Sequence, residues 1–154
     1  RAAELARDGL SRKEIVKEIE ALIPKINTSF VIDTLTYLWK GGRCSGLSAM
    51  GANLLQLKPC IEVIEGTLKV GKKYRGSLER CLNAYVDERL TDLDKISPKR
   101  IFITHTSQDE ELVQKIKEKI ESKNYFEEVL VTSAGGTISC HCGPGTLGVV
   151  YIDK

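Results

Sequence analysis

"RIFITHTSQDEELVQKIKEKIESKNYFEEVLVTSA", residues 100–134, is the stretch that decides the fold. Residues 100–107 are rich in branched and aromatic side chains and predict a strand. Residues 107–123 predict a helix that begins at a capping box formed by Ser107 and Glu110. Residues 127–134 predict a second strand. A strand, a helix and a strand in this order predict two parallel strands joined by a right-handed crossover.

The segments around this unit predict the rest of a sheet. Residues 60–76 predict a hairpin, because Ile61 and Val63 alternate with polar residues and Glu65-Gly66 supplies a tight turn. Residues 147–153 are apolar for most of their length and predict a central strand. One hairpin and one crossover indicate a mixed β-sheet with helices packed on it, which is the α+β class.

The N-terminal half contributes several helices. Residues 2–8 and 12–23 predict two helices, the second beginning at a capping box of Ser11 and Glu14. Residues 27–33 predict a strand, and residues 34–42, 45–55 and 77–90 predict three further helices.

The composition is that of one ordinary globular domain. Of 154 residues, 42% are hydrophobic and 29% are charged, with 23 basic and 21 acidic side chains interspersed along the chain. We expect no nucleic-acid partner, because no basic block is present, and no membrane span, because no apolar stretch approaches roughly 20 residues. Five irregularly spaced cysteines predict no disulfide framework, and we expect a cytoplasmic protein.

The candidate site lies in "SCHCGPGTLG", residues 139–148, where a histidine stands between two cysteines. A metal site is disfavoured because, in an extended segment, Cys140 and Cys142 point away from His141, and no second ligand pair completes the four that structural zinc needs. A cysteine nucleophile is disfavoured because adjacent residues rarely bring their side chains within hydrogen-bonding reach.

A binding loop remains as the functional interpretation. Gly143 and Gly145 allow backbone conformations in which N–H groups converge on an anion, and His141 offers a donor beside them. This combination suits a carboxylate or a phosphate. The structural alternative is a glycine turn between two strands, with the histidine satisfied by a carbonyl group. The other histidine, His105, is more typical of a strand end than of a site.

Four stretches together resemble the DegV family of bacterial fatty-acid-binding proteins. They occur in the family's order, and the similarity runs from about Phe30 to the end of the chain. The specific elements are D-T-L-x-Y-L-x-K-G-G-R and the closing H-x-G-P-G-x-L-G. The four stretches are "FVIDTLTYLWKGGRCS" at 30–45, "LLQLKPCIEVIEGTLK" at 54–69, "IFITHTSQDEELVQKIKEKI" at 101–120 and "GGTISCHCGPGTLGVVYI" at 135–152.

The resemblance implies a fold and a function. It implies that residues 27–154 form the C-terminal lipid-binding lobe of a two-lobed protein, preceded by lead-in helices over residues 1–26, and that the N-terminal lobe is absent from this chain. It further implies a protein that is not an enzyme and uses no metal or other cofactor. Such a protein holds a long-chain fatty acid and presents the carboxylate to a separate fatty acid kinase subunit.

The resemblance also implies roles for single residues. His141 matches the histidine of the closing motif and would join the hydrogen-bond network of the carboxylate, with Gly143 and Gly145 shaping the loop beside it. Arg43 matches the arginine of G-G-R and would lie near the head group or the lobe interface. Arg75 matches an arginine that follows the hairpin and would face the kinase.

Two cysteines depart from the family pattern, because Cys140 and Cys142 replace smaller or hydroxyl-bearing residues around the histidine. We expect the acyl tail to lie on the apolar side of the 45–55 helix, which carries Leu47, Met50, Leu54 and Leu55.

Two other functional classes remain open at this stage. One is a phosphoryl-carrying or phosphate-binding enzyme domain that uses His141. The other is a purely structural lobe that supplies an interaction surface and binds no lipid.

Overall fold

The computed structural model describes residues 1–42 and 57–154 of the chain. The described residues form a six-stranded sheet with strand order β3-β2-β1-β6-β4-β5. The helix expected over residues 45–55 and Arg43 lie outside the described residues. The strands are β1 Ile26–Val31, β2 Leu57–Ile64, β3 Thr67–Arg75, β4 Ile96–Thr106, β5 Glu128–Ser133 and β6 Thr146–Asp153.

The sheet is mixed, as the sequence predicts. β4 and β5 pair in parallel, with Ile103 opposite Val131, and the crossover between them contains α5 (Glu110–Glu121). The other four strand pairs are antiparallel, including the hairpin of β2 and β3. β6 lies between β1 and β4 and is a central strand, which confirms the expectation for residues 147–153. The α+β class is therefore confirmed.

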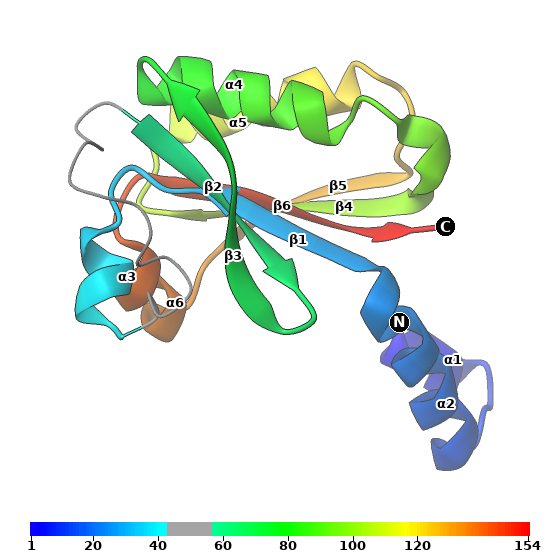
Figure 1. The fold of residues 1–154 in the computed structure, drawn as a ribbon. Helices are drawn as coiled ribbons and strands as arrows, with labels where there is room; N and C mark the ends of the chain where they lie inside the picture. The colour runs from blue at the N-terminus through cyan, green and yellow to red at the C-terminus, as the bar shows by residue number, and fades with distance from the viewer. Residues whose placement is uncertain (43–56) are drawn as a thin grey trace.

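Helices cover the two faces of the sheet unequally (Figure 1). α4 (Leu78–Arg89) and α5 run side by side across one face, which we call the packed face. α3 (Thr36–Lys40) and α6 (Gly136–Cys142) lie together on the other side, at one end of the sheet. We call this second side the open face, because the helices of the described chain cover only part of it.

The main core lies between the packed face and its two helices. Alternation along β4 and β6 directs every second side chain to this side, and Ile101, Ile103, Leu147 and Val149 among them are fully buried. α4 and α5 contribute their apolar stripes to the same cluster. The central members are Leu82, Tyr85, Val86, Ile101, Ile103, Ile116, Ile120, Leu147 and Val149.

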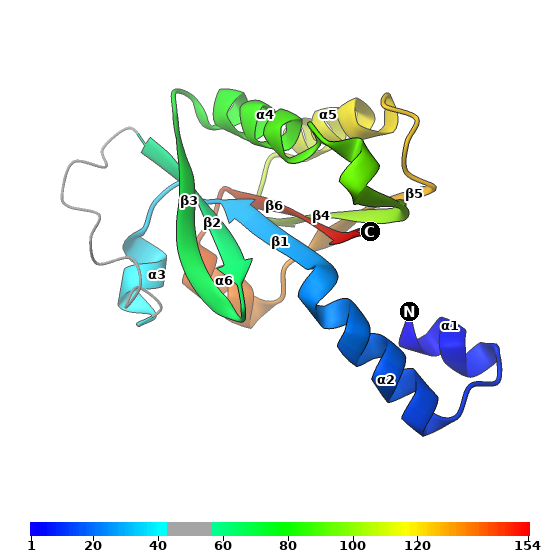
Figure 2. The same cartoon turned by 45° about the vertical axis from the view of Figure 1, so that its right-hand side comes forward.

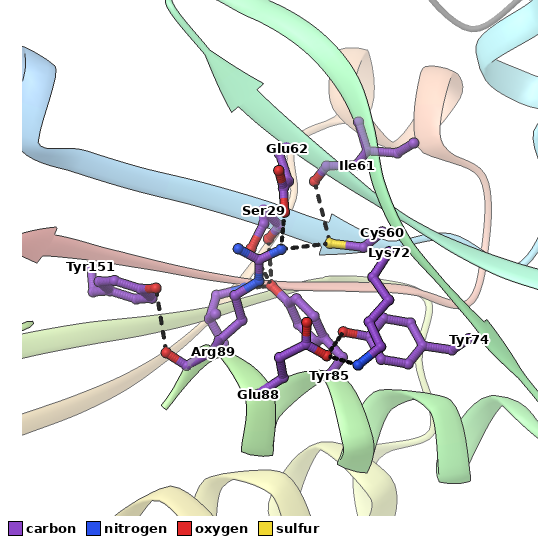
Figure 3. Close-up of polar contacts among 11 residues, drawn as sticks. Ser29, Cys60, Ile61, Glu62, Lys72, Tyr74, Tyr85, Glu88, Arg89 and Tyr151 are labelled. Atoms are coloured by element: carbon purple, nitrogen blue, oxygen red, sulfur yellow. Dashed lines mark hydrogen bonds and ion pairs between the residues drawn. The ribbon is translucent and has the colours of Figure 1, made fainter. Parts of the chain in front are cut away.

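The hydroxyl of Tyr85, on α4, bridges the two central strands (Figure 3). It donates to the carbonyl oxygen of Ser29 at 2.7 Å and accepts from the backbone N–H of Val149 at 3.0 Å. The Ser29 hydroxyl lies 2.8 Å from the same oxygen. Burial raises the pKa of Tyr85, so the hydroxyl stays protonated and keeps its donor.

A second polar cluster ties the hairpin to α4 (Figure 3). The guanidinium of Arg89 pairs with Glu62 of β2 and contacts the Cys60 sulfur at 3.3 Å. Glu88 accepts from Lys72 at 2.6 Å and from the hydroxyl of Tyr74 at 2.9 Å, both on β3. These contacts fix the hairpin against α4 on the side away from α3 and α6.

The N-terminal helices project from the far end of the sheet (Figures 1 and 2). They are α1 (Ala2–Arg7) and α2 (Arg12–Leu22), and a 3-10 turn over Ile23–Lys25 leads from α2 into β1. The capping box of Ser11 and Glu14 is confirmed. Glu4 joins α1 to the start of β4 through Lys99 at 2.9 Å, and its pKa falls to about 2 mainly because of that hydrogen bond.

The second predicted capping box is wrong. α5 begins after Asp109, whose side chain accepts from the backbone N–H of Glu111 at 3.0 Å, so Asp109 is the N-cap. Ser107 instead takes a positive φ of 42°, at the turn between β4 and the helix. Ser and Asp are both good N-caps, and the spacing alone favoured the residue two positions too early.

Candidate functional site: an apolar groove on the open face

An apolar groove lies on the open face, between the sheet and the pair α3 and α6. Its volume is about 380 Å³. No Asp, Glu, Lys or Arg occurs among the described residues that line it. The polar residues along its lining are Thr28, Ser29, Thr104, Thr106, Thr137, Thr146 and the two histidines of the chain. The apolar lining includes Phe30, Leu38, Val63, Leu68, Ile138 and Val150.

Strand register explains why these side chains face the groove. Phe30 of β1 is paired with Gly148 of β6, and Thr28 is paired with Val150, so these residues share the open face. Ser29, between them, bonds to Tyr85 on the packed face. β1 and β6 therefore carry core on one face and groove lining on the other. A Cβ atom on Gly148 would lie 2.4 Å from the Ser29 carbonyl oxygen and 2.6 Å from the Phe30 Cβ atom, so the glycine allows the close approach of β1 and β6 at this pair.

The segment around His141 is helical, which corrects the interpretation of residues 139–148 as extended. α6 ends at Cys142, and the N–H of Gly143 donates to the Ser139 carbonyl at 2.9 Å. The argument from alternating directions against a metal site is therefore wrong. In the part of the chain that the structure describes, no group of three or more His, Cys, Asp or Glu residues is placed to hold a metal ion.

His141 lies in the groove wall with one nitrogen unsatisfied. Its Nδ1 atom is buried and has no hydrogen-bond partner among the described residues. The structural alternative, a histidine satisfied by a carbonyl group, is wrong for this nitrogen. An unpaired buried polar atom is costly unless a partner arrives. This nitrogen lies on the α3 side of the ring, because a Cβ atom built on Gly41 would be 2.1 Å from it. His141 is thus a polar residue in the wall of an otherwise apolar groove.

The loop after His141 is held by internal hydrogen bonds, and these bonds use its amides. Gly143 and Gly145 have positive φ values of 77° and 78°. The N–H of Gly145 donates to the Thr106 carbonyl at 3.1 Å, the Thr106 hydroxyl donates to the Gly143 carbonyl, and the N–H of Thr146 donates to the Thr106 hydroxyl at 3.3 Å. The expectation that the amides of Gly143 and Gly145 converge on an anion is therefore wrong, and both residues shape the loop.

The two cysteines of the motif differ in environment. Cys142 is buried in the groove wall, and burial raises the pKa of its thiol. Cys140 is exposed on α6. A protonated, buried thiol is a weak nucleophile, so Cys142 acts here as an apolar lining residue.

His105 also borders the groove, which the sequence interpretation as a strand-end histidine did not anticipate. It is paired with Leu147, and alternation places its side chain on the packed face with Ile103. Its Nδ1 atom is likewise buried without a partner among the described residues. His105 thus borders the groove from β4, and His141 borders it from α6.

The structure describes one of the two remaining predicted residues, Arg75. Arg43 lies outside the described residues. Arg75 is exposed at the end of β3 and does not line the groove. No helix among the described residues is long and apolar enough to cross a membrane.

The arrangement suits an amphiphile. An apolar, uncharged groove can bury a hydrocarbon chain, and an imidazole in its wall can hydrogen-bond a polar end. A phosphate or nucleotide would meet no cationic side chain among the described lining residues.

Comparison with known proteins identifies a family. A family model described as "Uncharacterised protein, DegV family" matches residues 1–154. A DegV domain-containing protein from Clostridium acetobutylicum is 33% identical over 150 residues, covering 97% of this chain and 52% of the relative. Another from Caldanaerobacter subterraneus subsp. tengcongensis is 30% identical and matches 100% of this chain and 54% of the relative. The chain thus spans about half the length of these relatives.

Solved structures show the same fold. A fatty-acid-binding DegV family protein from Thermus thermophilus superimposes with a TM-score of 0.78 at 31% identity, covering 100% of this chain and 55% of that chain. The fatty acid kinase B3 protein of Streptococcus pneumoniae, loaded with linoleic acid, gives a TM-score of 0.83 at 27% identity, with 99% and 53% covered. On the full-length family match and these shared folds, the chain belongs to the DegV family.

Proposed function

We propose that this chain is the lipid-carrying lobe of a fatty-acid-binding protein and performs no bond-making of its own. The groove on the open face holds the acyl chain, and His141 takes part in the hydrogen-bond network of the carboxylate. The observation that carries the proposal is an apolar groove of about 380 Å³, free of charged side chains among its described residues, with His141 as a polar residue in its wall. The similarity to fatty-acid-binding DegV proteins supports the same ligand.

The energetics of fatty-acid binding match an apolar groove for the acyl chain and a hydrogen-bond donor for the carboxylate. Burying acyl methylenes contributes about 0.8 kcal/mol each, and the apolar lining of the groove provides the surface. A buried carboxylate without partners would cost several kcal/mol. A histidine donor offsets that cost, and a charge-assisted hydrogen bond of this kind contributes about 1.5–3 kcal/mol.

The proposed function also involves an N-terminal lobe and a separate kinase subunit. We assign residues 27–154 to the C-terminal lobe and residues 1–26 to its lead-in helices, and the N-terminal lobe would complete the site around the carboxylate. A fatty acid kinase subunit would then receive the carboxylate from the loaded protein. The similarity to the fatty acid kinase B3 protein of S. pneumoniae supports a kinase partner. Arg43 would lie near the head group, and Arg75 would face the kinase.

Lipid retention tests the proposal. The full-length protein, purified without detergent, should release long-chain fatty acid on extraction and mass spectrometry, and His141→Ala should retain about tenfold less. Cys140→Ala, an exposed neighbour on α6, is the matched control and should retain the wild-type amount. No lipid in the wild type, together with no binding of added palmitate, would remove the proposal.

A phosphate-handling function is tested by the same variant. A phosphoryl carrier would form phosphohistidine with a phosphodonor, and His141→Ala would lose it. The buried position of the Nδ1 atom disfavours phosphorylation at that nitrogen.

A further inference from the structure

We propose that Gly41 and Tyr37 are positioning residues that fix the His141 ring through two reciprocal glycine–ring contacts between α3 and the end of α6. The inference rests on the proposed function, because the ring it positions is the one assigned to the carboxylate. It concerns Gly41 and Tyr37 of the D-T-L-x-Y-L-x-K-G-G-R stretch, and no role has been assigned to these two residues above.

The first contact places the imidazole on Gly41. A Cβ atom built on Gly41 would lie 2.1 Å from Nδ1 and 2.8 Å from Cε1 of His141. The ring therefore occupies the space that any side chain at position 41 would fill. Gly41 has a φ of −79°, which every residue type adopts easily. The glycine is needed here for the ring's position and not for an unusual backbone conformation.

The second contact runs in the opposite direction. A Cβ atom built on Gly143 would lie 2.3 Å from Cδ2 of Tyr37, inside the tyrosine ring's own volume. Tyr37 belongs to α3, and Gly143 directly follows α6. Each segment thus supplies one ring and one glycine. The α3 segment supplies Tyr37 and Gly41, and the α6 segment supplies His141 and Gly143. α3 cannot shift along α6 without one ring striking backbone.

This arrangement explains how a short helix can hold a functional ring. α6 has seven residues, and helices of that length are marginal on their own. The two contacts tie its C-terminal end to α3, while the Thr106 hydroxyl holds the Gly143 carbonyl from the sheet side. His141 is thereby held from both sides, and its Nδ1 atom stays buried at the α3 contact.

Gly41→Ala is the direct test. The added methyl group must displace the His141 ring, and we expect palmitate affinity, measured by calorimetry on the full-length protein, to fall about tenfold. In NMR spectra of the palmitate-free protein, the imidazole resonances of His141 should shift in Gly41→Ala relative to the wild type. Gly136→Ala is the matched control, because a Cβ atom there meets nothing within 4 Å, and it should change neither quantity.

A double-variant cycle separates positioning from general damage. In a His141→Ala background, Gly41→Ala should cause no further loss of affinity, because the ring through which it acts is gone. Tyr37→Ala should reproduce the resonance shift and part of the affinity loss, and Tyr37→Phe, which keeps the ring, should restore both. These variants also decide the matter if Gly41→Ala fails to fold.

The outcomes distinguish this inference from the proposed function. Wild-type protein that binds no palmitate would remove the function, while the His141 resonances would still report the ring's position in each variant. Normal binding with unchanged resonances in Gly41→Ala, or an equal further loss in the His141→Ala background, would overturn the positioning role alone.

Discussion

The two faces of this sheet are built from the same strands, and yet one face carries the main core and the other lines a groove. The packed face carries fully buried residues such as Ile103, Leu147 and Val149 against α4 and α5. The open face carries Phe30 and Val150, which are only partly buried and line a groove. Since the strands are shared, the difference arises from which helices lie on each side. One face buries its apolar surface in the main core, and the other leaves part of its apolar surface lining a groove.

Adjacent residues on β6 give the largest expected contrast. Val149→Asp would bury an unpaired carboxylate in the packed face, at a cost of several kcal/mol, comparable to the whole stability of a domain. We expect this variant to be unfolded by circular dichroism at 25 °C. A folded Val149→Asp protein would contradict the assignment of the packed face as the main core.

Val150→Asp should give the opposite pattern. The carboxylate at position 150 faces the groove, where water solvates it in the free protein, so the variant should fold. An acyl chain would have to remove that water, and palmitate affinity should fall at least about tenfold. Calorimetry measures the affinity and urea unfolding measures the stability. Wild-type affinity in a folded Val150→Asp protein would place the acyl chain elsewhere.

The bridge between the faces is the Tyr85 hydroxyl. Tyr85→Phe would leave the Ser29 carbonyl and the Val149 N–H without their partner, and we expect a loss of about 1–3 kcal/mol in the free energy of unfolding. Urea denaturation of the wild type and the variant checks the difference. Equal urea midpoints for the wild type and Tyr85→Phe would show that the Tyr85 hydroxyl does not stabilise the pairing of β1 with β6.

The same tyrosine predicts an alkaline limit to stability. Burial raises the pKa of Tyr85 in the folded state above the ordinary value of about 10. The folded state therefore favours the neutral hydroxyl, so its contribution is complete below pH 10 and declines as the pH rises above 10. Unfolding free energy measured from pH 8 to 11 should fall at the upper end, and Tyr85→Phe should flatten that fall. An unchanged slope in the variant would assign the decline to other groups.

The smallest expected effect lies in α1, far from both faces. The pKa of Glu4 is lowered to about 2, chiefly by its hydrogen bond to Lys99. The attachment of α1 should therefore be intact above pH 4.5 and weaken as the pH falls toward 2. Hydrogen exchange of the α1 amides should quicken over that interval, and Glu4→Gln should exchange quickly throughout. Equal exchange rates of the α1 amides in the wild type and Glu4→Gln at pH 7 would show that Glu4 and Lys99 do not hold α1 to β4.

Local patterns in the sequence predict most of the fold. The parallel unit of β4, α5 and β5, the hairpin and the central position of β6 follow from alternation, turn residues and chain order, and the structure confirms them. Helix starts were less secure, because Ser107 and Asp109 are both suitable caps and only the tertiary turn decides between them. The sequence predicts an extended segment around His141, whereas residues 136–142 form a short helix that contacts α3.

The site was harder to predict than the fold. His141 stood out as a residue, but the groove beside it depends on the register that pairs Phe30 with Gly148 and on the placement of α3. The spacing of Gly143 and Gly145 does not reveal that the Gly143 amide is bonded to Ser139. It also does not reveal that the Gly143 carbonyl and the Gly145 amide are both bonded to Thr106 of β4. The contact of Gly41 with His141 joins residues 100 positions apart, and only the tertiary structure brings them together.

The most direct test asks which face of the sheet touches the ligand. In protein with ¹³C-labelled methyl groups, the chain protons of bound palmitate should give nuclear Overhauser effects to Leu68, Ile138 and Val150 on the open face. They should give none to Val86 or Ile116 in the packed core. Effects confined to the methyl groups of the groove are the result we predict. Effects to Val86 and Ile116, with none to the groove, would contradict the division of labour between the two faces.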